Sequence, residues 1–148
     1  MDGDVFTDTN VLVYSRDTAE PEKHRKARAW MAHLWTTRQG RLSYQVLQEF
    51  YVTVTEKLDP GLDRESARRE VLSFTPWRPV TIDARVLEAA WQVQDRYRLS
   101  WWDALIVAAA QVAGCEYLLT EDLQDDQMLG TVQVVNPFRT PPERLTGR

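Results

Sequence analysis

The segment LSWWDALIVAAAQVAGC, residues 99–115, carries one charged side chain, Asp103, in a chain where 27% of the residues are charged. At the helical repeat, Leu105 and Val112 fall on one face, while Val107 flanks the side that carries Asp103. A helix that is apolar nearly all round has to be buried, so we expect this segment to be the central helix of the core. Its single carboxylate then needs an explanation.

Asp103 has two explanations at this stage. A carboxylate on a buried helix costs several kcal/mol unless something compensates its charge. One compensation is structural: Ser100 caps the helix, Asp103 occupies its third position, and the helix dipole adds about 0.3–1 kcal/mol. The other is a bound metal ion. The segment alone leaves both open.

Short apolar runs alternate with helical periodicities along the rest of the chain. Strands are predicted at residues 4–8, 41–44, 75–82, 117–120 and 131–135. Helices are predicted at residues 10–16, 23–38, 45–58, 63–74, 83–97 and 99–115. The third strand is interrupted by proline and is expected at a sheet edge. This alternation predicts an α/β fold, a three-layer α/β/α sandwich with a central, mainly parallel sheet.

The chain has 148 residues, the length of one domain. We expect residues 1–138 to form that domain and residues 139–148, which are poor in apolar side chains, to be a loosely ordered tail. No run reaches the roughly 18 uncharged apolar residues of a membrane span, and the N-terminus lacks the pattern of a signal peptide. A cytoplasmic protein without a membrane partner is therefore expected.

Several common kinds of site are excluded by missing motifs. The chain has no Walker A loop, no G-x-G-x-x-G and no G-x-S-x-G. Cys115 is the only cysteine, so neither an internal disulfide nor a thiolate metal cluster is available. His24 and His33 are nine positions apart, too far for a metal pair one helical turn apart. The remaining candidates for chemistry are acids.

Three further acids stand out by position. Asp8 and Glu49 are each the only charged residue in a segment longer than ten residues, and Asp122 directly follows a predicted strand. Each has an ordinary explanation: Asp8 can cap a helix, Glu49 can face solvent, and Asp122 is one of several acids beside Glu121. Ligands of parallel sheets bind beyond the carboxyl ends of the strands, where Asp8 and Asp122 are expected.

Taken together with Asp103, these acids favour a shared metal site over separate caps. Carboxylate oxygens are hard ligands that prefer Mg²⁺ or Mn²⁺. Such an ion can polarise a phosphoryl oxygen, and a second ion can stabilise the leaving oxygen. The pattern therefore predicts hydrolysis of phosphodiester bonds.

The basic and aromatic residues suggest how a polyanion is held. Between residues 22 and 41 there are six Lys or Arg and one acid. The candidates for RNA phosphate contact are Lys23, Arg25, Lys26 and Arg28. A solvated helix face is the alternative explanation. Trp101 and Trp102 can stack on bases, but at the head of a buried helix we favour packing for both.

Four segments, in order and spacing, carry a family resemblance. FTDTNVLVY, QVLQEFY, SWWDALIVAAA and LLTEDLQDD resemble the signature segments of PIN-domain ribonucleases, and in particular the VapC-type toxins of bacterial toxin-antitoxin modules. The similarity runs from about residue 5 to residue 138. It implies a three-layer α/β/α fold with an acidic, Mg²⁺- or Mn²⁺-dependent site that cleaves RNA.

The resemblance also implies roles for individual residues. The metal-binding acids would be Asp8, Glu49, Asp103 and Asp122. Asn10 would orient Asp8 or a metal-bound water, and Thr120 would support the turn before Asp122. By its position one further turn along, Asp125 could at most hold an outer-shell water. The sequence departs from the family pattern at Asp126, where glycine is common, and at Thr7, where an aliphatic residue is usual.

Partners follow from the same resemblance. Family members are usually homodimers held inactive by a cognate antitoxin whose C-terminal segment occupies the active-site groove. We therefore expect a metal-dependent endoribonuclease toxin that binds RNA and an antitoxin. Two alternatives stay open: a PIN-fold binding module that has lost catalysis, and a nuclease outside any toxin-antitoxin module. No motif names the RNA that is cleaved.

Overall fold

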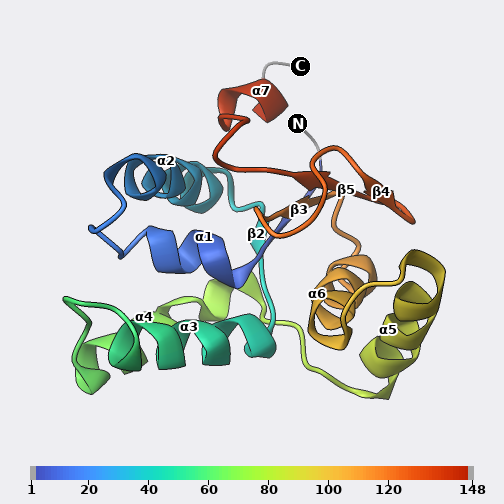
Figure 1. Cartoon of the computed structure of the whole chain (residues 1–148), viewed down its shortest axis with the longest axis horizontal. Helices are drawn as coiled ribbons and strands as arrows, with labels where there is room; N and C mark the ends of the chain where they lie inside the picture. Colours follow the sequence, from blue (N-terminus) through green and yellow to red (C-terminus); the bar gives the residue numbers. More distant parts are fainter. Residues whose placement is uncertain (1–2, 147–148) are drawn as a thin grey trace.

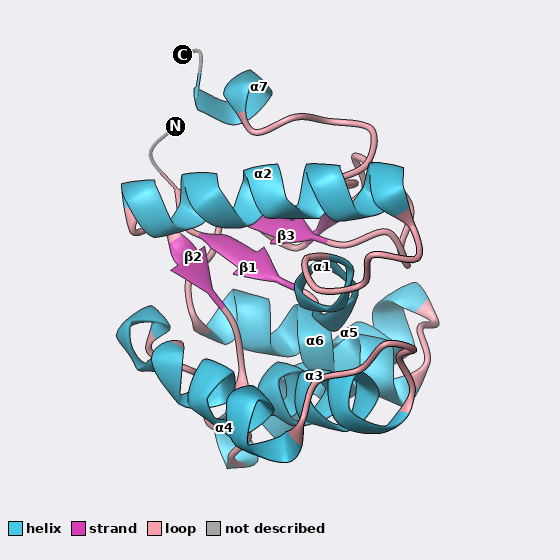
Figure 2. Cartoon of the chain, turned by 90° about the vertical axis from the view of Figure 1, so that its left-hand side faces the viewer, coloured by secondary structure: helices cyan, strands magenta, loops and turns pink. Residues whose placement is uncertain are grey.

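In the computed structural model, which describes residues 3–146, a five-stranded sheet lies between helical layers (Figures 1 and 2). The strands are β1 (Val5–Thr7), β2 (Gly40–Arg41), β3 (Tyr117–Leu119), β4 (Met128–Leu129) and β5 (Val132–Val135). The helices are α1 (Thr9–Tyr14), α2 (Pro21–Thr37), α3 (Tyr44–Glu56), α4 (Arg64–Ser73), α5 (Ala84–Tyr97), α6 (Trp101–Val112) and α7 (Glu143–Thr146), with a 3-10 turn η1 (Thr75–Trp77). The predicted fold class is confirmed. Helix α2 covers one face of the sheet, and α3, α4, α5 and α6 lie on the other side (Figure 2).

The sheet has the strand order β2-β1-β3-β5-β4 and is parallel except for β4. β1 and β3 are fully buried and pair in register, from Val5 opposite Tyr117 to Thr7 opposite Leu119. Because the two strands run in the same direction, their carboxyl ends reach the same edge. Asp8 and Asp122, which follow these strands, are thereby brought together.

Helix α6 is buried as its sequence predicts. The run from Ala104 to Ala110 is buried at every position, and α6 packs extensively against α5. The Ser100 hydroxyl accepts a hydrogen bond from the backbone N–H of Asp103 at 3.2 Å, so the helix is capped. Within residues 3–146, no helix is both long enough and apolar enough to cross a membrane.

The prediction of an edge strand at residues 75–82 is wrong. The segment forms η1, and Val80 makes only an isolated parallel bridge to Ser43. Two prolines remove backbone donors from the segment, and the buried Trp77 ring packs on Gly40 of β2 instead. The strand at the sheet edge next to β5 is β4. With two residues, β4 is too short for its sequence pattern to predict a strand.

The segment that leads into the predicted tail lies against helix α2. The Trp30 indole N–H on α2 lies 3.1 Å from the Pro137 carbonyl and 3.0 Å from the Thr140 carbonyl, and donates to both. Leu145 of α7 is buried. The segment packs because α2 supplies the hydrogen-bond donors and an apolar surface. Residues 147 and 148 lie outside the described part of the chain.

Asp126 occupies a left-handed backbone position, with φ of 66°. Glycine adopts this conformation most readily, and aspartate is among the few other residues that tolerate it. The Asp126 N–H donates to the Val134 carbonyl at 2.9 Å, so the turn is held in place. The departure from glycine is therefore compatible with the geometry of this turn.

The contact between Gly40 and Trp77 generates a stability prediction. A Cβ at position 40 would lie 2.5 Å from Trp77 Cη2. We expect Gly40→Ala to lower the free energy of unfolding by about 1–3 kcal/mol, because the core has to move to admit a methyl group. Urea denaturation measures the loss. In a Trp77→Phe background, whose smaller ring leaves space, the same substitution should cost less than half as much. An equal cost in both backgrounds contradicts this explanation.

Candidate active site

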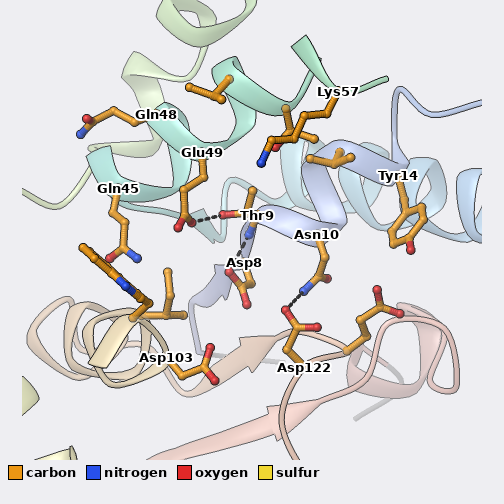
Figure 3. A pocket seen from close by; sticks show the side chains of 16 residues that line it. Asp8, Thr9, Asn10, Tyr14, Gln45, Gln48, Glu49, Lys57, Asp103 and Asp122 are labelled. Carbon is orange, nitrogen blue, oxygen red and sulfur yellow. Dashed lines mark hydrogen bonds between the residues drawn. The ribbon is translucent and has the colours of Figure 1, made fainter. Parts of the chain in front are cut away.

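All four predicted acids line one cavity of about 600 Å³ at the carboxyl edge of the sheet (Figure 3). Asp8 follows β1, Glu49 lies on α3, Asp103 lies in the first turn of α6, and Asp122 follows β3. Figure 3 shows the carboxylates of Asp8, Asp103 and Asp122 directed toward the same space. Acids that are separated by up to 114 positions in the chain therefore form one acidic pocket.

Asp8 is the buried centre of this pocket, with 6% of its surface exposed. Its Oδ1 accepts a hydrogen bond from Thr9 N at 2.7 Å, and its Oδ2 accepts one from the Thr120 hydroxyl at 2.8 Å. Burial raises the pKa of Asp8 to about 7; the two hydrogen bonds oppose the increase, and the charges of Asp122 and Glu49 add to it. Asp8 therefore caps α1 and also faces the pocket.

Asn10 holds Asp122 and not Asp8. Its Nδ2 donates to Asp122 Oδ2 at 3.1 Å and to Thr120 Oγ1 at 3.0 Å. Thr120 Oγ1 also accepts a hydrogen bond from Asp122 N at 3.1 Å. Thr120 thus connects the turn after β3 with Asp8, while Asn10 fixes the side chain at the end of that turn.

Glu49 is exposed and lines the pocket, so the cleft and solvent explanations both apply to it. Its Oε1 accepts a hydrogen bond from the Thr9 hydroxyl at 2.7 Å (Figure 3). Thr9 is a residue that the sequence analysis missed. It contacts Asp8 through its backbone N–H and Glu49 through its side chain, and so joins α1 to α3 across the pocket.

Asp103 is partly buried beside Asp122. Burial raises the pKa of Asp103, a hydrogen bond with Ser100 opposes the increase, and the charge of Asp122 adds to it. A role in the helix cap and a place in the pocket are therefore compatible at this residue. Ser100 caps the helix through the backbone of Asp103, while the carboxylate lines the pocket.

The donor set fits a hard divalent cation by its chemistry. It consists of carboxylate oxygens, and the Oδ1 of Asn10 is a further buried oxygen that has no hydrogen-bond partner among the described residues. Within residues 3–146, no three His, Cys, Asp or Glu side chains are grouped closely enough to hold a metal ion. Thr9 holds one oxygen of Glu49, and Asn10 holds one oxygen of Asp122.

Two acids near Asp122 have other contacts. Asp125 Oδ1 accepts a hydrogen bond from Asn136 N at 2.8 Å, and Asp125 is not among the lining residues of the pocket. This hydrogen bond stabilises the loop after β3. Glu121 lines the pocket and pairs with Lys23 at 2.8 Å.

The four basic residues of α2 predicted to contact RNA have different surroundings in the structure. Lys23 is paired with Glu121, Lys26 donates to the Phe138 carbonyl at 3.0 Å, and Arg25 pairs with Glu22 at 3.1 Å. Arg28 lines a different cavity, between α2 and α4. Three of the four basic side chains therefore have partners within the protein.

Two large side chains in the pocket carry none of the predicted roles. Gln45 on α3 is 8% exposed, and Trp102 on α6 is 63% exposed. Gln45 lies one helical turn before Glu49, so the helical wheel already places the two on one face. The sequence also marks Trp102 as a candidate for the pocket, because this aromatic residue directly precedes Asp103.

The raised pKa of Asp8 generates a pH prediction. Between about pH 4 and pH 7 the folded protein keeps a proton on Asp8 that the unfolded chain has released, so this group lowers stability as the pH rises through that window. Asp8→Asn removes the ionisation. We expect the variant to exceed wild type in free energy of unfolding at pH 8 by about 1–4 kcal/mol, and by much less at pH 4. Urea denaturation in EDTA measures both differences, and equal differences at the two pH values contradict the assignment.

The chain is similar in fold to solved structures and matches a family model. A toxin-antitoxin complex from Klebsiella pneumoniae contains a chain with a TM-score of 0.62 and 21% identity, covering 90% of this chain and 97% of that one. VapBC2 from Rickettsia felis, bound to a DNA fragment from their promoter, gives a TM-score of 0.60 and 13% identity, covering 89% and 97%. No curated protein sequence matches. The PIN domain model matches residues 5–127, and the chain therefore belongs to the PIN-domain family.

Proposed function

We propose that the protein is a divalent-metal-dependent endoribonuclease and the toxin of a VapBC-type toxin-antitoxin module. The observation that carries the proposal is the burial of Asp8 in a pocket lined by Glu49, Asp103 and Asp122. A carboxylate whose pKa is raised to about 7 by burial, with three other acids beside it, is a poor choice for stability alone. A cation site explains the arrangement.

The cation would be held by Asp8, Asp103 and Asp122, with Glu49 at the exposed side of the pocket. When bound, Mg²⁺ or Mn²⁺ polarises a phosphoryl oxygen of the RNA and offsets the negative charge of the acids. A phosphodiester is negatively charged, so it can approach the pocket only when the charges of the acids are offset.

The chain's own residues orient this chemistry. Thr9 N and Thr120 Oγ1 occupy one oxygen each of Asp8, which fixes the plane of its carboxylate. Asn10 fixes Asp122 in the same way. Glu49 is exposed and held by the Thr9 hydroxyl, so it is placed to accept a proton from the water that attacks phosphorus.

Both the fold and the surface of the protein support a protein partner. Both structural neighbours come from toxin-antitoxin assemblies, which supports a cognate antitoxin as the partner. An antitoxin segment with an Arg or Lys side chain suits the acidic pocket, because it replaces the charge of the cation. Tyr44, Val52 and Leu72 form an exposed apolar patch on α3 and α4, which supports a protein interface, with the antitoxin or within a homodimer.

A cleavage assay with matched acid variants tests the proposal. Wild type should cut a pool of labelled single-stranded RNA in Mn²⁺ and not in EDTA. Asp103→Asn and Asp122→Asn should each reduce the rate by more than about 100-fold, because they remove a charge that faces the ion directly. Asp126→Asn is the control, since it removes an exposed charge from the same loop as Asp122 without touching the pocket.

The outcomes separate the alternatives. No cleavage by folded wild type, together with tight binding of an antitoxin, identifies a binding module that lacks catalysis. Cleavage of DNA in preference to RNA places the enzyme outside the proposed class. Equal losses in Asp126→Asn and Asp122→Asn contradict the assignment of Asp122.

A further inference from the structure

Gln45 lines the pocket with a buried amide that lacks hydrogen-bond partners among the described residues. Its amide is buried, with 8% of the residue exposed, and neither its Nε2 nor its Oε1 has a hydrogen-bond partner among the described residues. Figure 3 shows the amide extending from α3 toward the acidic pocket. Buried amides are nearly always paired, because an unpaired one loses its hydrogen bonds to water without replacement. A ligand group with one donor and one acceptor side by side would satisfy both atoms.

Trp102 is the second unexplained side chain of this pocket. It is 63% exposed, whereas its neighbour Trp101 packs against the core. The packing explanation therefore holds for Trp101 and fails for Trp102. Trp102 lines the same cavity as Gln45 and directly precedes Asp103. An exposed indole beside an acidic site offers a flat apolar face to whatever binds there.

We propose that Trp102 and Gln45 form a nucleobase subsite next to the acidic site. An unpaired base stacks on the Trp102 indole, while the Gln45 amide donates one hydrogen bond to the base edge and accepts another. Adenine offers one such pair, with its N6 amino group as donor and its N7 as acceptor. The inference rests on the proposed function and names how the RNA substrate is held.

The position of the two residues ties the subsite to the reaction. Gln45 lies one turn before Glu49 on α3, and Trp102 lies one residue before Asp103 on α6. The base would thus be bound beside the phosphate that the acids address. A base inside a duplex cannot stack on a side chain, so the subsite selects single-stranded RNA.

The charges that line the pocket favour base stacking over phosphate binding as the source of affinity for RNA. The lining residues of the pocket in the described chain include five acids and one lysine, Lys57. The nearby Lys23 is already paired with Glu121. Few phosphates can be contacted from such a surface, so base contacts have to supply much of the binding free energy.

Fluorescence with a stacked base analogue tests the subsite. The probe is a short single-stranded RNA that carries one 2-aminopurine, bound in Ca²⁺ and checked for intact length afterwards. Wild type should quench the 2-aminopurine, and Trp102→Leu should abolish the quenching and weaken binding about 5- to 100-fold. Gln45→Leu should weaken binding of the same RNA with adenine in place of 2-aminopurine, with a melting temperature no lower than wild type because an unpaired polar group is removed. Trp91→Leu, at a 54% exposed indole on α5 outside the pocket, is the matched control and should behave as wild type.

An otherwise identical RNA that is abasic at the probe position separates base recognition from general damage. The losses in Trp102→Leu and Gln45→Leu should be small with the abasic RNA. Equal losses with both RNAs, or wild-type binding by both variants, overturn the subsite while the proposed nuclease function stands. Weakened binding of a basic antitoxin peptide with unchanged RNA binding also overturns it. Failure of wild type to bind or cleave any RNA is the distinct result that removes the proposed function itself.

Discussion

The parallel pairing of β1 with β3 is the constraint on which the site depends. Two three-residue strands, buried on both faces, end at one sheet edge, where Asp8 and Asp122 follow them. Thr120 then connects the two ends, since its hydroxyl donates to Asp8 and accepts from the backbone of Asp122. A shift of β3 by one residue would turn Thr120 away from Asp8 and break this connection.

Holding these acids together in a pocket costs free energy that the fold alone does not offset. Asp8 has two hydrogen bonds, yet burial and two neighbouring acids still raise its pKa to about 7. The carboxylates of Glu49 and Asp122 are held by Thr9 and Asn10, a polar framework that keeps the acids oriented in the absence of an opposite charge. Such a framework is stable enough to fold and becomes fully compensated only by a ligand that brings positive charge.

The sequence predicts the parts of this protein whose pattern is local or strongly apolar. The α6 helix, the alternation of strands and helices, and the isolated acids can all be read from periodicity and charge. The edge segment at residues 75–82 cannot, because the packing of Trp77 on Gly40 joins two distant positions. The same limit applies to the basic residues of α2: that Lys23 pairs with Glu121 depends on tertiary structure, which no local pattern encodes. The unpaired amide of Gln45 is likewise visible only in three dimensions.

The central claim is that the acids of β1, α3, α6 and the turn after β3 share one divalent cation site. Anomalous diffraction from crystals soaked in Mn²⁺ near pH 8 tests it most directly, because it locates the ion without relying on activity. We expect an anomalous peak between Asp8, Asp103 and Asp122, with oxygen atoms of at least two of them about 2.0–2.3 Å away. A fully occupied peak elsewhere, or an ordered pocket without any peak at millimolar Mn²⁺, would contradict it.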